Sequence, residues 1–212
     1  MGLVHFDRRP YDELYAAFRW PTLDAYNIAT DVCDKWAGDP DRVALIDAAP
    51  AILARFPEVR FIVAGDGDRL GEVADLARRV NQRLGREHVF VPGGRTDAPD
   101  LLRAADVVVG VARVALEAMA TGKPVVIAGE GGLRGVLDAD NAALMMACNF
   151  TGRGSGRAVT AGELARLLLE LLDAPDRRTG LGLIGRELVE RFFSIERVAD
   201  QVEAVYAEVC EG

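Results

Sequence analysis

The stretch ADVVVGVARVALEAMATGKPVVIAGEGG, residues 105–132, decides the fold class that the sequence predicts. Residues 107–109 form an apolar run typical of a parallel strand buried on both faces. Residues 113–120 are mostly good helix formers, and the glycine and proline that follow end this helix before a second buried strand at 125–128. In open α/β folds, such a unit brings its loops and the helix N-terminus to the carboxyl edge of a sheet, where ligands bind.

Helical and strand patterns alternate on both sides of this unit, which predicts a Rossmann-like parallel sheet with helices on both faces and a helical C-terminus. A helix that Asp138 or Asp140 caps and that runs to about Cys148 follows the glycine-rich loop at 129–132. The other predicted helices are 46–56, 69–84, 99–104, 161–172, 175–192 and 194–209, and the other predicted strands are 59–64 and 88–91.

The sequence LEAMATGKPVV at residues 116–126 resembles, at every fixed position, a signature of the donor-sugar half of GT-B glycosyltransferases of the family 4, glycogen-synthase-like group. Three further segments match this family in the family's order: FPEVRFIVAGDGD at 56–68, DAPDLLRAADVVV at 97–109 and FSIERVADQVEAVY at 193–206. The resemblance covers residues 43–212 and implies half of a GT-B fold that binds a nucleotide-diphosphate sugar for retaining glycosyl transfer.

The resemblance also implies a donor site. A UDP- or GDP-sugar would place its ribose at Glu117, its phosphates at the helix start formed by Ala112 and Arg113, and its sugar at a loop that contains Glu130, Gly131 and Gly132. Arg134 is a further candidate contact, and Arg95 a nearby cation. Such folds require no metal or other cofactor, and the resemblance identifies no catalytic residue.

Two of these features have alternative interpretations. A buried, unpaired Glu117 would cost several kcal/mol, so it either lies near the helix start and pairs with an arginine or accepts hydroxyl hydrogens from a ribose. The glycines after residue 128 permit backbone N–H groups to approach a phosphate or sugar, whereas a tight turn alone would need one or two of them. The glycine-rich residues 151–157 contain two arginines that could bind an anion, but their composition is more typical of a surface loop.

The sequence departs from the family at two places. Val109 stands where the family has a second glutamate that contacts donor hydroxyls, and the family's first strand, with an Arg and a Lys for the pyrophosphate, has no equivalent. These departures favour an alternative function, a non-catalytic GT-B-derived interaction module. Residues 11–46 instead resemble the N-terminus of medium-chain acyl-CoA synthetases, although the phosphate loop of that class is absent. An acyl-CoA synthetase-related fragment is therefore a third hypothesis.

Composition supports two parts, an aromatic-rich N-terminal arm at 1–42 and a donor-nucleotide domain at 43–212, because half of the aromatic residues lie in the first 36 positions. The arm could form a homodimer contact, contact a partner domain or cover the position of the first strand. A net charge of −8 argues against nucleic acid as a partner. No apolar stretch reaches the roughly 18 residues of a membrane span, and the first residues lack the apolar core of a signal peptide. We therefore expect a cytoplasmic protein.

Overall fold

The computed structural model describes residues 44–211, all of which belong to one compact unit. The aromatic-rich arm and the segment that resembles acyl-CoA synthetases lie outside the described residues, apart from the last positions of that segment. The division of the chain at residue 42 therefore stays a prediction, as do the contacts expected of the arm.

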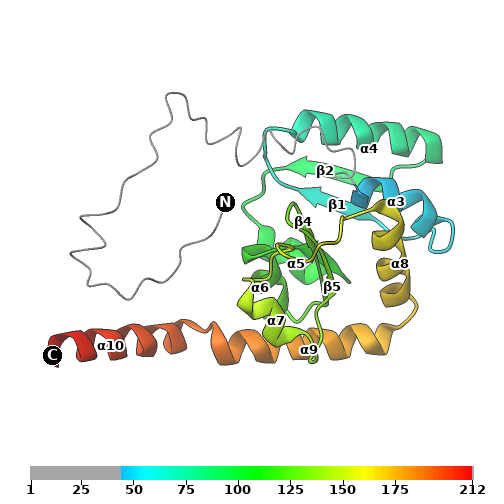
Figure 1. The fold of residues 1–212 in the computed structure, drawn as a ribbon. Coiled ribbons are helices and arrows are strands. Elements are labelled where there is room, and N and C mark those ends of the chain that lie inside the picture. The colour runs from blue at the N-terminus through cyan, green and yellow to red at the C-terminus, as the bar shows by residue number, and fades with distance from the viewer. Residues whose placement is uncertain (1–43, 212) are drawn as a thin grey trace. The chain divides into compact units, whose positions relative to one another are not determined.

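The strands form two sheets (Figure 1). In the first, β1 (Phe61–Ala64) pairs in parallel with β2 (Val89–Gly93). In the second, β4 (Val125–Gly129) pairs in parallel with β3 (Val108–Gly110) and antiparallel with β5 (Gly132–Val136). The α/β class with parallel strands flanked by helices is confirmed. The sheet differs from the prediction because it is divided and because β5 is antiparallel.

The strands form two sheets because no described strand occupies the position between β1 and β3. In a doubly wound fold the strand order is 3-2-1-4-5-6, and the pairs β2–β1 and β3–β4 take the places of strands 3-2 and 4-5. No described residue forms a strand in the place between β1 and β3. This is the position of the family's first strand, for which the sequence analysis found no equivalent.

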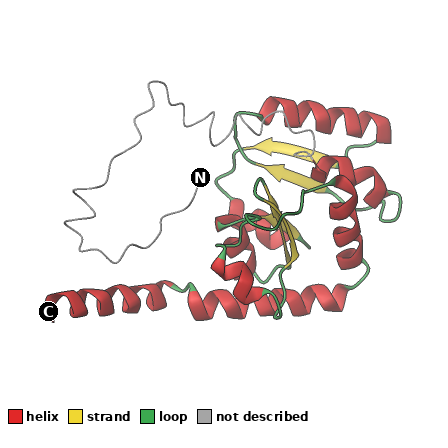
Figure 2. Cartoon of the chain, viewed as in Figure 1, coloured by secondary structure: helices red, strands yellow, loops and turns green. Residues whose placement is uncertain are grey.

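Helices surround the strands and make up the C-terminal third of the chain (Figure 2). Local signals fix several helix ends. Gly85, with φ 68°, ends the helix at residues 70–84. The Thr160 hydroxyl caps the helix that begins at Ala161 by accepting from the Glu163 N–H. The helices are α3 (Ala44–Leu53), α4 (Leu70–Leu84), α5 (Ala98–Ala104), α6 (Arg113–Ala120), α7 (Ala142–Ala147), α8 (Ala161–Leu172), α9 (Pro175–Phe192) and α10 (Ile195–Glu211).

The predicted bounds of α6, α8 and α9 are confirmed, and the Ser194 hydroxyl caps α10 by accepting from the Arg197 N–H. The region after β4 differs from the prediction, because residues 132–136 form a strand where a loop was expected. The N-cap of α7 is Asn141 and not an aspartate; the Asp138 carboxylate instead accepts from the Asn141 N–H at 2.9 Å.

β4 lies at the centre of the core because both of its faces are buried. Val126 and Ala128 pack in a cluster with α3, α4, α8 and the first sheet. Val125 and Ile127, which point to the opposite face, pack in a second cluster with α6, α7 and Phe150. This two-sided burial is what the continuous apolar run of β4 predicts.

Candidate functional site

The N-terminus of α6 lies directly after β3, at the carboxyl end of that strand. Ala112, the residue before α6, has φ 49° and ψ −120°, a conformation that favours glycine. Its N–H donates to the carbonyl of Phe150 at 3.0 Å. Phe150 is fully buried and packs edge-on against Phe193, with the ring centroids 5.7 Å apart. The segment after α7 thus holds the start of α6 in a strained backbone conformation.

Glu117 and Arg113, both predicted donor contacts, form an ion pair one turn apart on α6. Arg113 Nε donates to Glu117 Oε1 at 2.8 Å, and the two side chains are 90% and 41% exposed, respectively. The carboxylate is therefore not buried, and the arginine-pair interpretation describes the structure as it stands. Exposed pairs of this kind stabilise a fold by about 0–1 kcal/mol, so a ligand could replace the pair at small cost.

The predicted sugar loop is the turn of the β4–β5 hairpin. Glu130 and Gly131 form the turn, with Gly129 ending β4 and Gly132 starting β5. A Cβ at Gly129 would lie 2.8 Å from a methyl group of Val111, the residue before Ala112. The turn and the start of α6 therefore adjoin each other at one edge of the sheet, as the sequence predicts.

The glycine-rich residues 151–157 pack against this hairpin. A Cβ at Gly152 would lie 2.0 Å from the Gly132 carbonyl oxygen, and one at Gly131 would lie 2.8 Å from the Arg153 nitrogen. The Leu133 N–H donates to the Arg157 carbonyl at 2.9 Å. The glycines of the turn thus allow the backbone of residues 152–153 to pack directly against it. The sequence analysis had considered only a ligand or a tight turn as the reason for these glycines.

Each of the three predicted cations already has a partner. Arg113 pairs with Glu117, Arg134 Nη2 donates to the Arg153 carbonyl at 2.6 Å, and Arg95 donates to Asp97 at 2.7 Å. The hydrogen bond from Arg95 lowers the pKa of the Asp97 carboxyl, so this pair is ionised at neutral pH. Arg134 Nε is buried and has no hydrogen-bond partner among the described residues.

Arg153 is one of the two arginines at 151–157 for which the sequence analysis left two interpretations, an anion contact or a surface loop. Its side chain lies beside Gly131, because a Cβ there would be 2.9 Å from Arg153 Cγ. The Arg153 side chain is exposed, and its guanidinium pairs with no residue in the range 44–211. The signal in the sequence was the pair of arginines among the glycines of 151–157.

Val109, the apolar replacement of the family's second glutamate, lies in β3 and is half-buried. It packs against the core cluster that contains α3 and α8. A carboxylate in these apolar surroundings would lose hydration at a cost in free energy. An apolar side chain such as valine is therefore the more stable residue at this position. The contact to donor hydroxyls that the resemblance implies at this position cannot be made by a valine.

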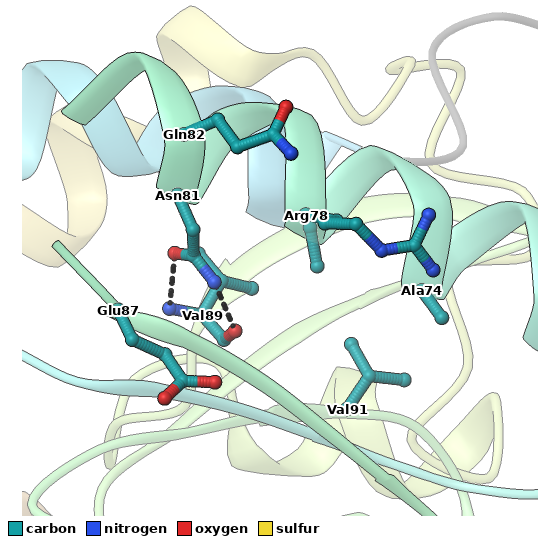
Figure 3. A pocket seen from close by; sticks show the side chains of 8 residues that line it. Ala74, Arg78, Asn81, Gln82, Glu87, Val89 and Val91 are labelled. Atoms are coloured by element: carbon teal, nitrogen blue, oxygen red, sulfur yellow. Dashed lines mark hydrogen bonds between the residues drawn. The ribbon is translucent and has the colours of Figure 1, made fainter. Parts of the chain in front are cut away.

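A pocket of about 300 Å³ lies elsewhere, between α4 and β2 (Figure 3). Asn81 points into it and donates to the Val89 carbonyl at 2.8 Å while accepting from the Val89 N–H at 3.0 Å. The amide thereby satisfies the outer edge of β2, as a neighbouring strand would do. None of the predicted donor contacts lines this pocket. We attribute the pocket to the packing of α4 along the edge of β2, where Asn81 takes up the free backbone groups.

Comparison with known proteins identifies the family. The family model "Glycosyl transferases group 1" matches residues 43–172, more than half of the chain, and the chain belongs to this family. A GDP-mannose-dependent monoacylated alpha-(1-6)-phosphatidylinositol monomannoside mannosyltransferase of Corynebacterium glutamicum is 30% identical over 175 residues, which cover 75% of this chain and 42% of the relative. These findings do not support the resemblance to acyl-CoA synthetases.

Solved structures support the fold assignment. HepE of Anabaena in complex with UDP has a TM-score of 0.57 at 22% identity, covering 82% of this chain and 46% of HepE. The C-terminal domain of a group 1 glycosyl transferase, LpcC, of Francisella tularensis has a TM-score of 0.54 at 21% identity, covering 72% of this chain and 79% of that domain. The chain thus spans less than half the length of the mannosyltransferase and of HepE.

Within residues 44–211, no helix combines the length and the apolar character needed to cross a membrane.

Proposed function

We propose that the edge formed by the start of α6 and the β4–β5 turn binds a nucleotide-diphosphate sugar, a UDP- or GDP-sugar, as the donor half of a retaining glycosyltransferase. The observation that carries the proposal is the strained Ala112 at the start of α6, which adjoins the β4–β5 turn at one edge of the sheet. The exposed Arg113–Glu117 pair beside it can be replaced by a ligand at small cost. Backbone strain costs about 1–3 kcal/mol and is concentrated at binding sites.

The diphosphate binds at the N-terminus of α6. The helix dipole places partial positive charge there, and Arg113 leaves Glu117 to contact a phosphate oxygen. Arg153, which pairs with no described residue, supplies a second cation from the adjoining loop. In glycosyl transfer the anomeric carbon forms a bond to the acceptor oxygen, which loses its proton, and the bond from that carbon to the phosphate oxygen breaks. The same positive groups stabilise the charge on the departing diphosphate without a metal.

The exchange of partners at Arg113 frees the Glu117 carboxylate for the ribose. A carboxylate accepts hydrogen bonds from both ribose hydroxyls, and each charge-assisted bond contributes about 1.5–3 kcal/mol. The pair that the ligand replaces contributes less than this. The turn with Glu130, Gly131 and Gly132, with Arg134 behind it, then faces the sugar. Two relatives support this choice of donor: the mannosyltransferase uses GDP-mannose, and HepE has been solved with UDP and with UDP-glucose.

Calorimetric titration of the full chain with UDP, GDP and ATP tests the proposal. We expect UDP or GDP to bind, and Glu117→Ala to weaken that binding by at least about tenfold to a hundredfold, because each of the two charge-assisted bonds it removes contributes that much. Glu190→Ala is the matched control, because Glu190 pairs with Arg186 in the same i,i+4 arrangement on an exposed face of α9. Equal nucleotide affinities of the two variants would show that Glu117 is not part of the binding site.

A second comparison separates the phosphate contact from the ribose contact. Arg113→Ala should weaken the binding of UDP or GDP, because only the diphosphate carries the charge that Arg113 meets. The free nucleoside should bind the variant at least as tightly, because Glu117 no longer has to leave its arginine partner.

A non-catalytic interaction module is the second candidate, and Val109 favours it because an apolar side chain packed against the core makes no polar contact to a donor. The absence of any nucleotide binding at millimolar concentration would support this candidate. Binding of ATP alone would contradict both.

A further inference from the structure

The loop at residues 151–157 is fixed to the protein at both of its ends. Just before its start, the Phe150 carbonyl accepts from the Ala112 N–H at 3.0 Å. At its end, Arg157 Nη2 donates to Glu163 Oε1 at 2.8 Å. Three glycines lie between these ends. Because the backbone of glycine is conformationally permissive, the middle of the loop keeps one conformation only where further contacts hold it.

Arg134, in β5, makes a contact of this kind with the middle of the loop. Its Nη2 donates to the Arg153 carbonyl at 2.6 Å and so links residues that are 19 positions apart in the sequence. A Cβ at Gly154, which has φ 73°, would lie 3.5 Å from the same nitrogen. The Arg134 guanidinium therefore lies against the backbone from which the Arg153 side chain extends.

The stability of the fold alone does not account for an arginine at position 134. Its Nε is buried without a hydrogen-bond partner among residues 44–211, and a buried donor that lacks a partner lowers stability. The hydrogen bond to the Arg153 carbonyl lies at an exposed position, where water could replace the arginine. Buried unsatisfied groups are uncommon in folded proteins, and a functional role is one explanation for them.

The residue that Arg134 holds is the unpaired cation of the proposed donor site. The Arg153 side chain is exposed and pairs with no described residue, whereas Arg157 of the same loop pairs with Glu163. Arg153 Cγ would lie 2.9 Å from a Cβ at Gly131, in the β4–β5 turn. An arginine loses conformational freedom when it binds a ligand, and a backbone that is already held in place reduces this loss.

We propose that Arg134 is a positioning residue, which holds the backbone of Arg153 so that the Arg153 guanidinium meets the donor diphosphate. Arg134 itself does not touch the donor, in contrast to the direct contact that the sequence analysis considered. Arg153 thereby supplies, from another part of the chain, positive charge in place of the family's Arg and Lys, for which the sequence analysis found no equivalent. This inference rests on the proposed donor site.

A double-mutant cycle, measured by calorimetric titration of the full chain with UDP and GDP, tests the inference. We expect Arg153→Met to weaken nucleotide binding by about tenfold or more, because it removes a charge-assisted contact. Arg134→Met should weaken binding by about threefold to tenfold where Arg153 is present, and by less than about twofold in the Arg153→Met background. Equal losses in both backgrounds would show that Arg134 acts on the nucleotide through its own charge, which would overturn the inference.

Nuclear magnetic resonance relaxation measures the positioning directly, without a ligand. In Arg134→Met, the backbone order parameters of residues 153 and 154 should fall from the value of about 0.85 that is typical of rigid backbone to below about 0.6. The order parameters of β4 should stay unchanged and show that the variant remains folded. Unchanged order parameters at 153 and 154 would overturn the inference.

Arg178→Met is the matched control. Arg178 Nη1 likewise donates to a backbone carbonyl, that of Leu171 at 2.7 Å, but this bond joins α9 to the end of α8 and no predicted donor contact takes part in it. The control should change neither the nucleotide affinity nor the order parameters of residues 153 and 154.

The outcomes separate this inference from the proposed function. If neither UDP nor GDP binds the unaltered chain, the proposed donor site is wrong, and the inference is wrong with it. If a nucleotide binds and Arg134→Met changes neither its affinity nor the order parameters of the loop, the donor site stands and only the inference is wrong.

Discussion

Ala112 connects the fold to the proposed function at the scale of a single residue. Its positive φ turns the chain from β3 into α6 and brings the helix start to the edge of the sheet. An L-residue with a side chain rarely adopts this conformation. The hydrogen bond to Phe150, itself anchored in the core, holds it in place. The strained conformation of Ala112 is thus maintained by the packing of Phe150, about forty residues further along the chain.

Replacing Ala112 with glycine should relieve this strain. The conformation costs about 1–3 kcal/mol for a residue with a Cβ, whereas glycine adds about 0.5–1 kcal/mol of chain entropy to be lost on folding. We expect Ala112→Gly to stabilise the protein by up to about 2 kcal/mol, measured as the free energy of unfolding in urea. Ala118→Gly, in the middle of the same helix, should destabilise it by about 1 kcal/mol or more. A loss of stability in both variants would show that Ala112 is not strained.

The pairing of Glu117 shows why residue chemistry alone left two interpretations open. A glutamate in an apolar helix needs a partner, and the sequence contains both an arginine four residues earlier and a resemblance that implies a ribose. The structure contains the arginine pair. An exposed pair of low stability is compatible with either role, so the nucleotide titration is what distinguishes them.

At the scale of elements, α6 and α9 approach each other through glycines. A Cβ at Gly182 would lie 2.1 Å from the Gly122 carbonyl oxygen, and one at Gly185 would lie 2.9 Å from Met119 Cγ. The missing side chains allow α9 to pack closely against α6 and the turn that follows it. The packing of α9 therefore supports the helix that carries Arg113 and Glu117.

The variants Gly182→Ala and Gly180→Ala should change stability in opposite directions. The methyl group at position 182 meets backbone, which cannot yield without moving α9, so we expect a loss of about 2 kcal/mol or more, in the range of overpacked sites. The methyl group at 180 meets nothing within 4 Å, and alanine is a better helix former by about 1 kcal/mol, so this variant should be stabilised. Thermal unfolding of the two variants, monitored by circular dichroism, measures the difference. Equal melting temperatures would show that α9 adjusts without cost.

Sequence patterns predicted the elements that depend on local chemistry. The bounds of α6 and α8 follow from helix formers between clear end signals, and both are confirmed. The strand β5 was missed because its glycines are typical of a loop, and their reason lies elsewhere in the chain: Gly132, with φ 119°, contacts the backbone of Gly152. A close approach between residues twenty positions apart leaves no periodic signal. For the same reason, the sequence named Arg134 as a candidate donor contact but could not place Arg153 beside the turn.

At the scale of the whole molecule, the divided sheet is the main departure from a doubly wound fold. β1 and β3 each pair with a strand on one side only among the described residues. The Phe61 N–H donates to the His88 carbonyl at 2.8 Å, and the Val108 N–H donates to the Pro124 carbonyl at 3.0 Å. Because alternate peptide groups of a parallel strand point to opposite sides, the N–H groups of Ile62 and Val109 point away from these partners. Both face the place of the absent strand.

This geometry predicts the pattern of amide hydrogen exchange across the molecule. The amides of Phe61 and Val108 should exchange slowly, because opening their hydrogen bonds requires separation of packed strands. The amides of Ile62 and Val109 should exchange faster by about tenfold or more, although they are adjacent in the sequence, because no described residue pairs with them. Two-dimensional NMR after transfer into D₂O measures all four. The strand β4, which pairs on both sides, is the internal control, and its amides should be protected along its length. Slow exchange at Ile62 and Val109 together would contradict a divided sheet, because it would require a further strand between β1 and β3. A strand there that ran parallel to β3 would lie beside Val109, and its carboxyl end would reach the same edge as the start of α6.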